Sequence, residues 1–348
     1  MIDYSFIIPV FNCEEYIEAC VKSVIEIGLE SYEIILVDDG STDNSGILCD
    51  ALDAVYGRVK CIHQENQGVS AARNHGLQAA VGDYVIFIDA DDTIEPVGFE
   101  KILKRLQEDS EIDVVIFGIS FDYYYHGKCY RRDELPPALN GRIARNTWMD
   151  ELRQLYETNA LSPIWNKVIR RSFLKDNHLE LRRDMFLYED LEFSLRCLAH
   201  CGTILFLPDI IYHYRQTEDE GNAGRRLKRI DHLPSLVGQI EEALNNLTVC
   251  QNIQEMQEGI KEIPLLLYLV LAREKIAVST VREIKVICRD FSTWWSVHAQ
   301  PLREQDKQFV DQLLHQKIAQ MMCKRTYVAA RHKIAVSVKS SALYRKLR

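Results

Sequence analysis

The sequence lacks the features that would place it outside the ordinary globular proteins. Its 348 residues include only 16 glycines and 9 prolines, which excludes a collagen-like or low-complexity chain. The longest clean apolar run, IPLLLYLVLA at 263–272, is about half as long as a bilayer-spanning helix. The N-terminus carries an acid, Asp3, and no basic stretch, so we predict no secretory signal and a cytoplasmic location.

Paired cysteines are absent as well. The chain has 10 cysteines, but none form a C-x-x-C pair, and the closest two, Cys197 and Cys201, are one helical turn apart. Without pairing or an export signal, these side chains are expected to be reduced and mostly buried. We therefore predict neither a disulfide framework nor a zinc site.

Positive charge is scarce except at the C-terminus. The net charge of −9 argues against general nucleic-acid binding. Residues 324–348 nevertheless hold eight Lys and Arg residues and no acid, interleaved with apolar residues. Such a cationic amphipathic segment is predicted to lie on an anionic membrane surface, and a solvated chain end is the alternative.

Strand and helix patterns alternate over the first 120 residues. Short apolar, β-branched runs predict buried strands, and segments with helical periodicity lie between the first four of them. This order predicts βαβ units and a mainly parallel sheet covered by helices on both faces. The predicted strands are 5–10, 33–37, 59–63, 84–88 and 113–119, and the predicted helices are 14–27, 44–56 and 70–80.

The rest of the chain is less regular. The polar, aromatic segment 123–145 predicts a hairpin or insertion, helices are expected at 147–158 and 190–200, and short strands at 204–207 and 210–215. The charged segment 216–226 is typical of a linker. We therefore expect an α/β domain over residues 1–220 and a helical region with the basic tail over 221–348.

Four polar clusters follow four successive predicted strands. They are PVFN at 9–12, DDGSTD at 38–43, ENQGVSAARN at 65–74 and DADD at 89–92. Each could be a loop that caps a helix. However, ligands of an open α/β sheet bind beyond the carboxyl ends of its strands, so four clusters at one edge favour a single site.

The DADD cluster has the most specific chemistry. Asp89, Asp91 and Asp92 repel one another unless a cation or hydrogen-bond donors offset their charge. Carboxylate oxygens suit Mg²⁺ or Mn²⁺, which completes its coordination with water and substrate phosphates. The alternative is an Asp-rich turn that caps the next helix.

Two other clusters contain charges that turns and caps do not explain. A carboxylate at Asp38 or Asp39 could accept an N–H from a nucleobase. Arg73 lies near a helix start, where a cation is unfavourable unless an anion or an acid is close, and an ion pair with an Asp explains it equally well. There is no G-x-x-x-x-G-K-[ST] loop and no G-x-G-x-x-G, so a diphosphate would be held by metal and Arg.

Two aromatic segments remain open to interpretation. In the run Tyr212 to Arg215, alternation puts His213 and Arg215 on one face, where they could approach a diphosphate or simply belong to an edge strand. Trp165 could shape an acceptor pocket, but a core position is the simpler interpretation.

These blocks, in this order, resemble family 2 glycosyltransferases with the GT-A fold. The resemblance rests on FIIPVFNCEEYIEACVKSV, EIILVDDGSTDNS, ENQGVSAARNHGL and GDYVIFIDADD, and it extends over about residues 4–100. A looser similarity, in WNKVIRRSFL and FLYEDLEFSLRCL, is to the acceptor half of bacterial enzymes that build capsule, exopolysaccharide or lipopolysaccharide. Residues after 225 carry no useful resemblance.

The resemblance implies a nucleotide pocket. Pro9 and Phe11 match residues that line the base, Asp39 matches the contact to its polar edge with Asp38 close by, and Arg73 matches the basic residue of the pocket.

The resemblance also implies a metal site and a base. Asp89 and Asp91 match the D-x-D motif, in which Asp91, with Asp92, would hold Mn²⁺ or Mg²⁺ while Asp89 contacts the nucleotide. Asp190 matches the catalytic base. Without the resemblance, Glu189 and Asp190 are better explained as acids that complement a helix dipole.

The expected function is metal-dependent, inverting transfer of a sugar from a nucleotide-sugar, UDP-linked, to a hydroxyl of a glycan or lipid-linked saccharide in cell-surface polysaccharide synthesis. The basic tail would place the protein on the inner face of the membrane. Two alternatives are a non-catalytic scaffold that binds sugar nucleotides and a nucleotidyltransferase. The latter lacks the expected triphosphate loop after the first strand.

Overall fold

The structure is a computed structural model in which the chain divides into two compact units. One unit contains residues 1–219 and 240–263, and the other contains 220–239 and 264–348. The structure describes residues 3–109, 111–144, 151–185, 188–216, 234, 237–242, 264–265, 268–269, 272, 281–299, 302, 304–316 and 321. The division falls beside the boundary expected at residue 220 but assigns 240–263 to the first unit. The basic tail lies outside the described residues.

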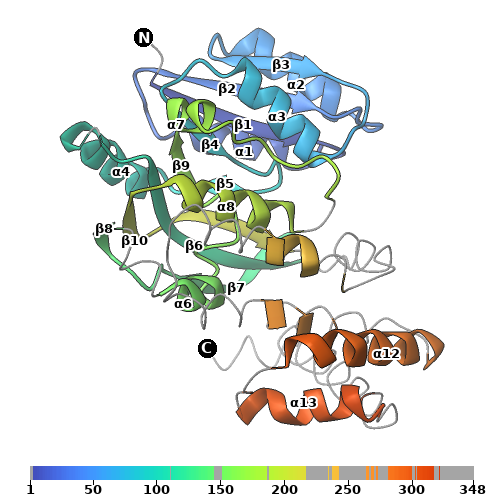
Figure 1. The fold of residues 1–348 in the computed structure, drawn as a ribbon. Coiled ribbons are helices and arrows are strands. Elements are labelled where there is room, and N and C mark those ends of the chain that lie inside the picture. Colours follow the sequence, from blue (N-terminus) through green and yellow to red (C-terminus); the bar gives the residue numbers. More distant parts are fainter. Residues whose placement is uncertain are drawn as a thin grey trace, which may run out of the picture. The chain divides into compact units, whose positions relative to one another are not determined.

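Within the described part of the first unit, ten strands form one sheet (Figure 1). The strands are β1 (Tyr4–Val10), β2 (Tyr32–Asp38), β3 (Val59–His63), β4 (Tyr84–Phe87), β5 (Thr93–Ile94), β6 (Val114–Tyr125), β7 (Lys128–Leu135), β8 (Gly141–Ala144), β9 (Lys167–Arg170) and β10 (Thr203–Gln216). Their order is β3-β2-β1-β4-β9-β6-β10-β5, with β7 beside β6 and β8 beside β10.

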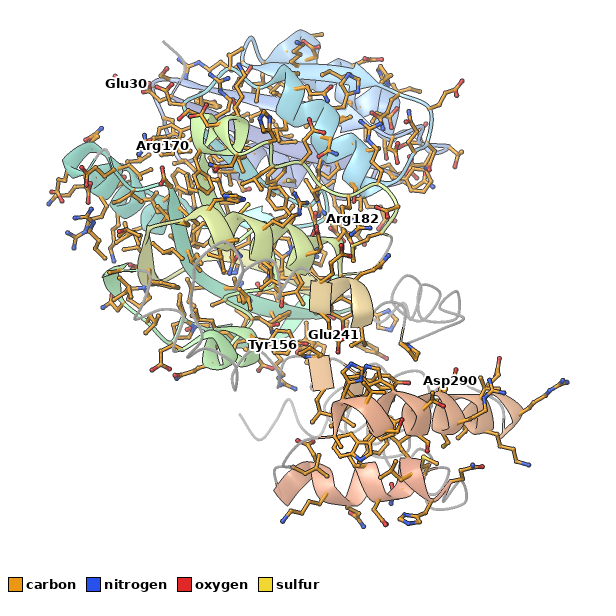
Figure 2. All side chains as sticks on the ribbon, viewed as in Figure 1. Glu30, Tyr156, Arg170, Arg182, Glu241 and Asp290 are labelled. Atoms are coloured by element: carbon orange, nitrogen blue, oxygen red, sulfur yellow. The ribbon has the colours of Figure 1, made fainter. Side chains whose placement is uncertain are left out.

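The sheet is mixed: the parallel part that the sequence predicted is present, but antiparallel pairings are added to it. Strands β3, β2, β1 and β4 run parallel to one another in that order, and β10 runs parallel to β6. Strand β9 is antiparallel to both β4 and β6. Arg170 of β9, labelled in Figure 2, places its guanidinium 5.1 Å from the ring centre of Tyr84 in β4.

Both faces of the sheet are covered by helices, because β1 is apolar on both sides. Phe6 and Ile7 on opposite faces are both fully buried. Phe6 belongs to one buried cluster with residues of helices α1 (Ile17–Ile25), α2 (Ser45–Val55) and α4 (Pro96–Glu108), and the ring centre of Phe99 in α4 lies 5.7 Å from its own. On the other face, Phe87 of β4 meets Phe193 of α8 (Glu189–His200) at 6.3 Å.

Helix α3 (Val69–Ala79) shares this second face and lies very close to the strands. A Cβ at Gly76 would come within 2.4 Å of Ile7 Cγ2, so glycine is required for this approach. The close packing brings the N-terminal half of α3 to the carboxyl ends of β1 and β4.

Two parts of the sheet differ from the prediction. Strand β9 was not predicted, because its apolar stretch is too short to stand out. The runs 204–207 and 210–215 form one strand, β10, whose register shifts between Leu207 and Ile210, around Pro208. A proline interrupts the ladder without ending the strand because a bulge accommodates it. The hairpin expected within 123–145 is present as the paired strands β6 and β7.

The remaining described helices are short or belong to the second unit. Helices α6 (Leu152–Glu157) and α7 (Arg171–Asp176) lie in the first unit, and α12 (Val281–His298) and α13 (Glu304–Leu314) in the second. There, Tyr268 packs against Phe291 at 5.1 Å and Trp294 at 4.9 Å. No helix in the described ranges is long and apolar enough to span a membrane.

Candidate functional site

The polar clusters after β1 and β2 lie together at the carboxyl edge of the sheet. Asn12 adopts a left-handed backbone with φ of 53°. Its Oδ1 accepts a hydrogen bond from the Thr42 N–H at 2.8 Å, and its own N–H donates to Ser41 Oγ at 3.1 Å. The loop after β1 is therefore fastened to the loop after β2.

The two expected base-lining residues occupy different environments. Pro9 is buried within β1 beside Val37 of β2. Phe11, just beyond the strand, is 47% exposed. An exposed aromatic ring at a strand end suits stacking against a flat base. Their contact with a nucleotide remains a prediction.

Asp38 is buried and bonded on both carboxylate oxygens. Oδ1 accepts the Ser41 N–H at 3.1 Å, and Oδ2 lies 2.9 Å from Nδ1 of His63 at the end of β3. Burial raises the pKa of Asp38, but these hydrogen bonds outweigh it and the net pKa is lowered. His63 also contacts Asp50, and the bonds to Asp50 and Asp38 raise its pKa to about 9.

Asp39 holds the loop that precedes α3. It is 3% exposed. Its Oδ1 accepts hydrogen bonds from the Gln64 side chain at 2.7 Å and the Gln67 N–H at 2.8 Å, and Oδ2 accepts the Gly68 N–H at 2.9 Å. The expected contact of Asp39 with a base edge stays a prediction. In this structure both carboxylate oxygens accept hydrogen bonds from the loop.

Arg73 joins three parts of the site. Its side chain is 3% exposed, with Nη1 2.7 Å from Asp190 Oδ1 of α8 and Nη2 2.6 Å from Asp89 Oδ1 after β4. Glu189 lies 4.0 Å away. Nε is buried and has no hydrogen-bond partner. The ion-pair interpretation of Arg73 is thus the one seen, and it brings together three of the predicted site residues.

The acids outnumber the cation in this cluster. Burial, together with the charges of Glu189 and Asp89, raises the pKa of Asp190 to about 7, although Arg73 opposes the shift. A carboxylate with a pKa near neutrality is well suited to general-base catalysis. Because Glu189, Asp190 and Glu192 also stand in the first turn of α8, the dipole interpretation and the catalytic one are compatible.

The backbone just before Asp190 is strained. Tyr188, the residue that precedes α8, has φ of 62°, in the left-handed region that bulky side chains rarely adopt. Such a conformation costs about 1–3 kcal/mol and is often found at functional sites.

Asp92 is buried and hydrogen-bonded on both carboxylate oxygens, and its expected role as a metal ligand stays a prediction. It is 1% exposed, its Oδ2 accepts a hydrogen bond from the Tyr212 hydroxyl at 2.7 Å, and its Oδ1 accepts the Arg215 N–H at 2.7 Å. The Tyr212 oxygen in turn accepts the Asp89 N–H at 3.0 Å. Asp92 therefore ties the DADD turn to β10, and Tyr212 is a positioning residue that the sequence did not reveal.

For a divalent cation we take Asp91, the expected ligand, together with Asp89, which the resemblance assigns to the nucleotide. The Asp89 side chain is 27% exposed, and Asp91 is half-buried. Two carboxylates fit Mg²⁺ or Mn²⁺, which takes one or two of them together with phosphate oxygens. Among the described residues, the one group of three side chains with ligand atoms within 4.8 Å of one another lies elsewhere, at Asp50, Cys61 and His63.

Arg215 stands directly beside the DADD turn. Its Nε donates to the Asp91 carbonyl at 3.1 Å, and its guanidinium lies 3.9 Å from the ring centre of Tyr124 and 5.1 Å from that of Tyr16. His213, predicted to share its face, instead contacts Asp122 at 3.2 Å. Of the two, Arg215 is the one that lies beside Asp91, where the diphosphate is expected.

The segment around Trp165 packs against Tyr212, the residue that bonds Asp92. Trp165 is 6% exposed and stacks on Tyr212 at 4.3 Å, which confirms the core interpretation. Lys167, 1% exposed, donates to the carbonyls of Ala160 at 3.2 Å and Leu161 at 3.1 Å, and burial lowers its pKa to about 7. Its burial was not predicted, because a lysine in a polar-looking segment gives no such signal.

Comparisons with known proteins agree with this geometry. Residues 5–177 match the sequence profile of the family described as Glycosyl transferase family 2. The chain is 31% identical over 214 residues to the uncharacterized glycosyltransferase EpsJ of Bacillus subtilis, and the match covers 61% of this chain and 60% of EpsJ. It is 30% identical over 221 residues to the glycosyltransferase GlyG of Streptococcus pneumoniae, covering 61% of this chain and 70% of GlyG.

The fold is also that of a solved relative. Residues 1–349 of TarS from S. aureus, in complex with UDP-GlcNAc, superpose with a TM-score of 0.53 at 19% identity, covering 84% of this chain and 87% of that one. The GT-A-type arrangement expected from the sequence is therefore confirmed. Given the profile, the relatives and the shared fold, the chain belongs to glycosyltransferase family 2.

Proposed function

We propose that the protein transfers a sugar, with inversion, from a UDP-sugar to a hydroxyl of a glycan or lipid-linked saccharide in cell-surface polysaccharide synthesis. One observation carries the proposal. Arg73 holds Asp89 of the D-x-D sequence and the candidate base Asp190 in one cluster, although Asp190 is 117 residues further along the chain than Arg73. The choice of donor is supported by TarS, whose crystal structure is a complex with UDP-GlcNAc.

The chemistry follows from the position of Asp190. Arg73 binds Oδ1 of Asp190, which orients the second oxygen of the carboxylate. That oxygen takes the proton of the acceptor hydroxyl as the hydroxyl oxygen attacks the anomeric carbon. The bond from that carbon to the nucleoside diphosphate breaks on the opposite side, so a single displacement inverts the configuration.

Charge on the departing diphosphate must also be neutralised. Asp91, with Asp89, would hold Mg²⁺ or Mn²⁺, which supplies Lewis-acid stabilisation of that charge when bound. Arg215, whose Nε already contacts the Asp91 carbonyl, adds a fixed positive charge on the same side.

A donor screen tests the proposal. Nucleoside-diphosphate release is measured for a panel of nucleotide-sugars with Mn²⁺, with Mg²⁺ and with EDTA, for the wild type and Asp91→Asn. We expect release from a UDP-sugar that EDTA and D91N both suppress. Activity that survives chelation would contradict the metal role. Binding without turnover for every donor would favour the scaffold, and pyrophosphate release from a nucleoside triphosphate would favour a nucleotidyltransferase.

The basic tail completes the proposal at the level of sequence. We propose that residues 324–348 hold the enzyme on the anionic inner face of the membrane, where lipid-linked acceptors are found. Truncation after residue 323 should weaken binding to anionic vesicles at low salt. Unchanged partitioning of the truncated chain would reject this part of the proposal.

A further inference from the structure

A cluster of metal-ligand side chains lies outside the site described above, between α2 and the edge strand β3. Cys61 and His63 alternate along β3, so both point to the same face of the strand. Asp50 comes from α2. His63 Nε2 lies 2.9 Å from Asp50 Oδ1 and 3.3 Å from Cys61 Sγ, so one ring nitrogen faces a carboxylate and a thiol together.

The orientation of His63 is set by its other ring nitrogen. Nδ1 lies 2.9 Å from Asp38 Oδ2, and Asp38 is fixed in turn by the Ser41 N–H. A histidine that binds a metal commonly donates its second N–H to a carboxylate, which selects the tautomer and directs the other nitrogen to the ion. Gly46 makes room for this arrangement, since a Cβ there would lie 3.0 Å from Asp38 Oδ2.

Helix α2 is fastened to β3 on the same side. Asp53, one turn beyond Asp50, accepts the backbone N–H of Cys61 at 2.9 Å. Among the described strands, β3 pairs only with β2, so its outer side depends on such contacts. The side chains of Asp50 and His63 are 65% and 48% exposed, so an ion could reach them from solvent.

We propose that Asp50, Cys61 and His63 form a zinc site that fastens the edge strand β3 to α2. A thiolate, an imidazole and a carboxylate are the three donor types that Zn²⁺ accepts in proteins, and a water would complete four-coordination. The thiolate separates this site from the all-oxygen pair at Asp89 and Asp91, which suits Mg²⁺ or Mn²⁺. The sequence did not suggest it, because the ligands form no C-x-x-C pair and one of them comes from a neighbouring helix.

Metal titration of the full chain tests the site. The protein is freed of metal with a chelator, and Zn²⁺ binding is followed by calorimetry, with Co²⁺ as a spectroscopic probe. We expect one saturable site, a thiolate-to-cobalt charge-transfer band, and a rise in melting temperature with Zn²⁺ that Mg²⁺ does not produce.

Variants assign the ligands. Cys61→Ser should remove the charge-transfer band, and Asp50→Asn, a change of an exposed side chain that should leave the fold intact, should weaken Zn²⁺ binding. Asp38→Asn should weaken it about 10–100-fold, as loss of a supporting carboxylate does. Two matched controls, Cys129→Ser at an exposed thiol of β7 and Asp91→Asn, should bind Zn²⁺ as the wild type does.

Three results would overturn the proposal. These are no saturable Zn²⁺ binding by the wild type, a charge-transfer band that persists in Cys61→Ser, and unaltered affinity in Asp50→Asn. Loss of Zn²⁺ binding in Asp91→Asn would likewise move the ion to the D-x-D turn. Far-ultraviolet circular dichroism of each metal-free variant shows whether it is folded, so a folding defect is not mistaken for a lost ligand.

Discussion

The acids at the end of β2 and the acids around Arg73 lie in contrasting environments. Asp38 and Asp39 receive hydrogen bonds from loop N–H groups and from side chains of β3 and the loop after it, so their charge is dispersed within the chain. Around Arg73, by contrast, three carboxylates share a single guanidinium: Asp89 after β4, and Glu189 and Asp190 of α8. The first arrangement makes a rigid support, and the second retains excess negative charge that can hold a proton or a metal ion. One edge of the sheet thus separates scaffolding acids from reactive ones.

The largest expected effect is on the reactive side. Asp190→Asn removes the proton acceptor but keeps the shape of the side chain, so the transfer rate should fall about 10²–10⁴-fold. Donor binding should change little. The measurement is kcat with saturating donor and acceptor, beside Asp176→Asn as a control acid on the surface of α7. Unchanged turnover in D190N would remove Asp190 as the base.

Arg73→Met tests whether the three carboxylates around Arg73 need its positive charge for the stability of the fold. It leaves Asp89, Glu189 and Asp190 crowded without their guanidinium. Breaking a buried ion pair on one side typically costs about 3–5 kcal/mol, and we expect that loss in the free energy of unfolding. Urea denaturation of wild type and variant gives the difference. A loss below about 1 kcal/mol, the range of surface pairs, would show that the cluster is not held by Arg73.

Asp39→Asn examines the supporting side. The amide keeps one acceptor oxygen but places an N–H₂ group against a donor from the loop 64–68, and we expect a loss of about 1–3 kcal/mol in stability. Amide hydrogen exchange of Gln67 and Gly68 should accelerate locally. If exchange rises as much around Asp89 as around Gly68, the two ends of the edge are not independent.

The smallest expected effect is on the pH dependence of kcat/KM, which reports on the acids around Arg73. The pKa of Asp190 is raised to about 7, so the residue is ready to accept a proton above that pH and is progressively protonated below it. kcat/KM should therefore fall about tenfold for each pH unit below 7 and level off above it. Glu189→Gln removes a neighbouring charge that raises this pKa, so its midpoint should move to lower pH. An unmoved midpoint would assign the titration to another group.

Much of the fold could be predicted, because local patterns determine it. The apolar runs at β1, β2 and β4 and the turn residues after them are visible within windows of about ten residues. Strand β9 was missed because it is short and takes its place between β4 and β6 only through tertiary pairing. The register shift at Pro208 likewise depends on β6, a partner far away in sequence.

The site could be predicted in composition but not in connectivity. The D-x-D acids and Asp190 were found from motifs, whereas the hydrogen bond from Tyr212 to Asp92 joins residues 120 positions apart and leaves no local trace. For the same reason, the buried and hydrogen-bonded position of Asp92 could not be predicted, because its side chain is the same as that of Asp91. A buried lysine at 167 is also invisible in sequence, since only the surrounding carbonyls show why it is there.

The distance along the chain between Arg73 and Asp190 has a consequence for synthesis. As the polypeptide leaves the ribosome, Arg73 and Asp89 are both synthesised well before the acids of α8. The segment matched by the family profile ends at residue 177, before all three acids in the first turn of α8. A fragment cut there would contain β1 to β9 yet lack Glu189 and the base. Any minimal version of this enzyme built for engineering must therefore extend through α8.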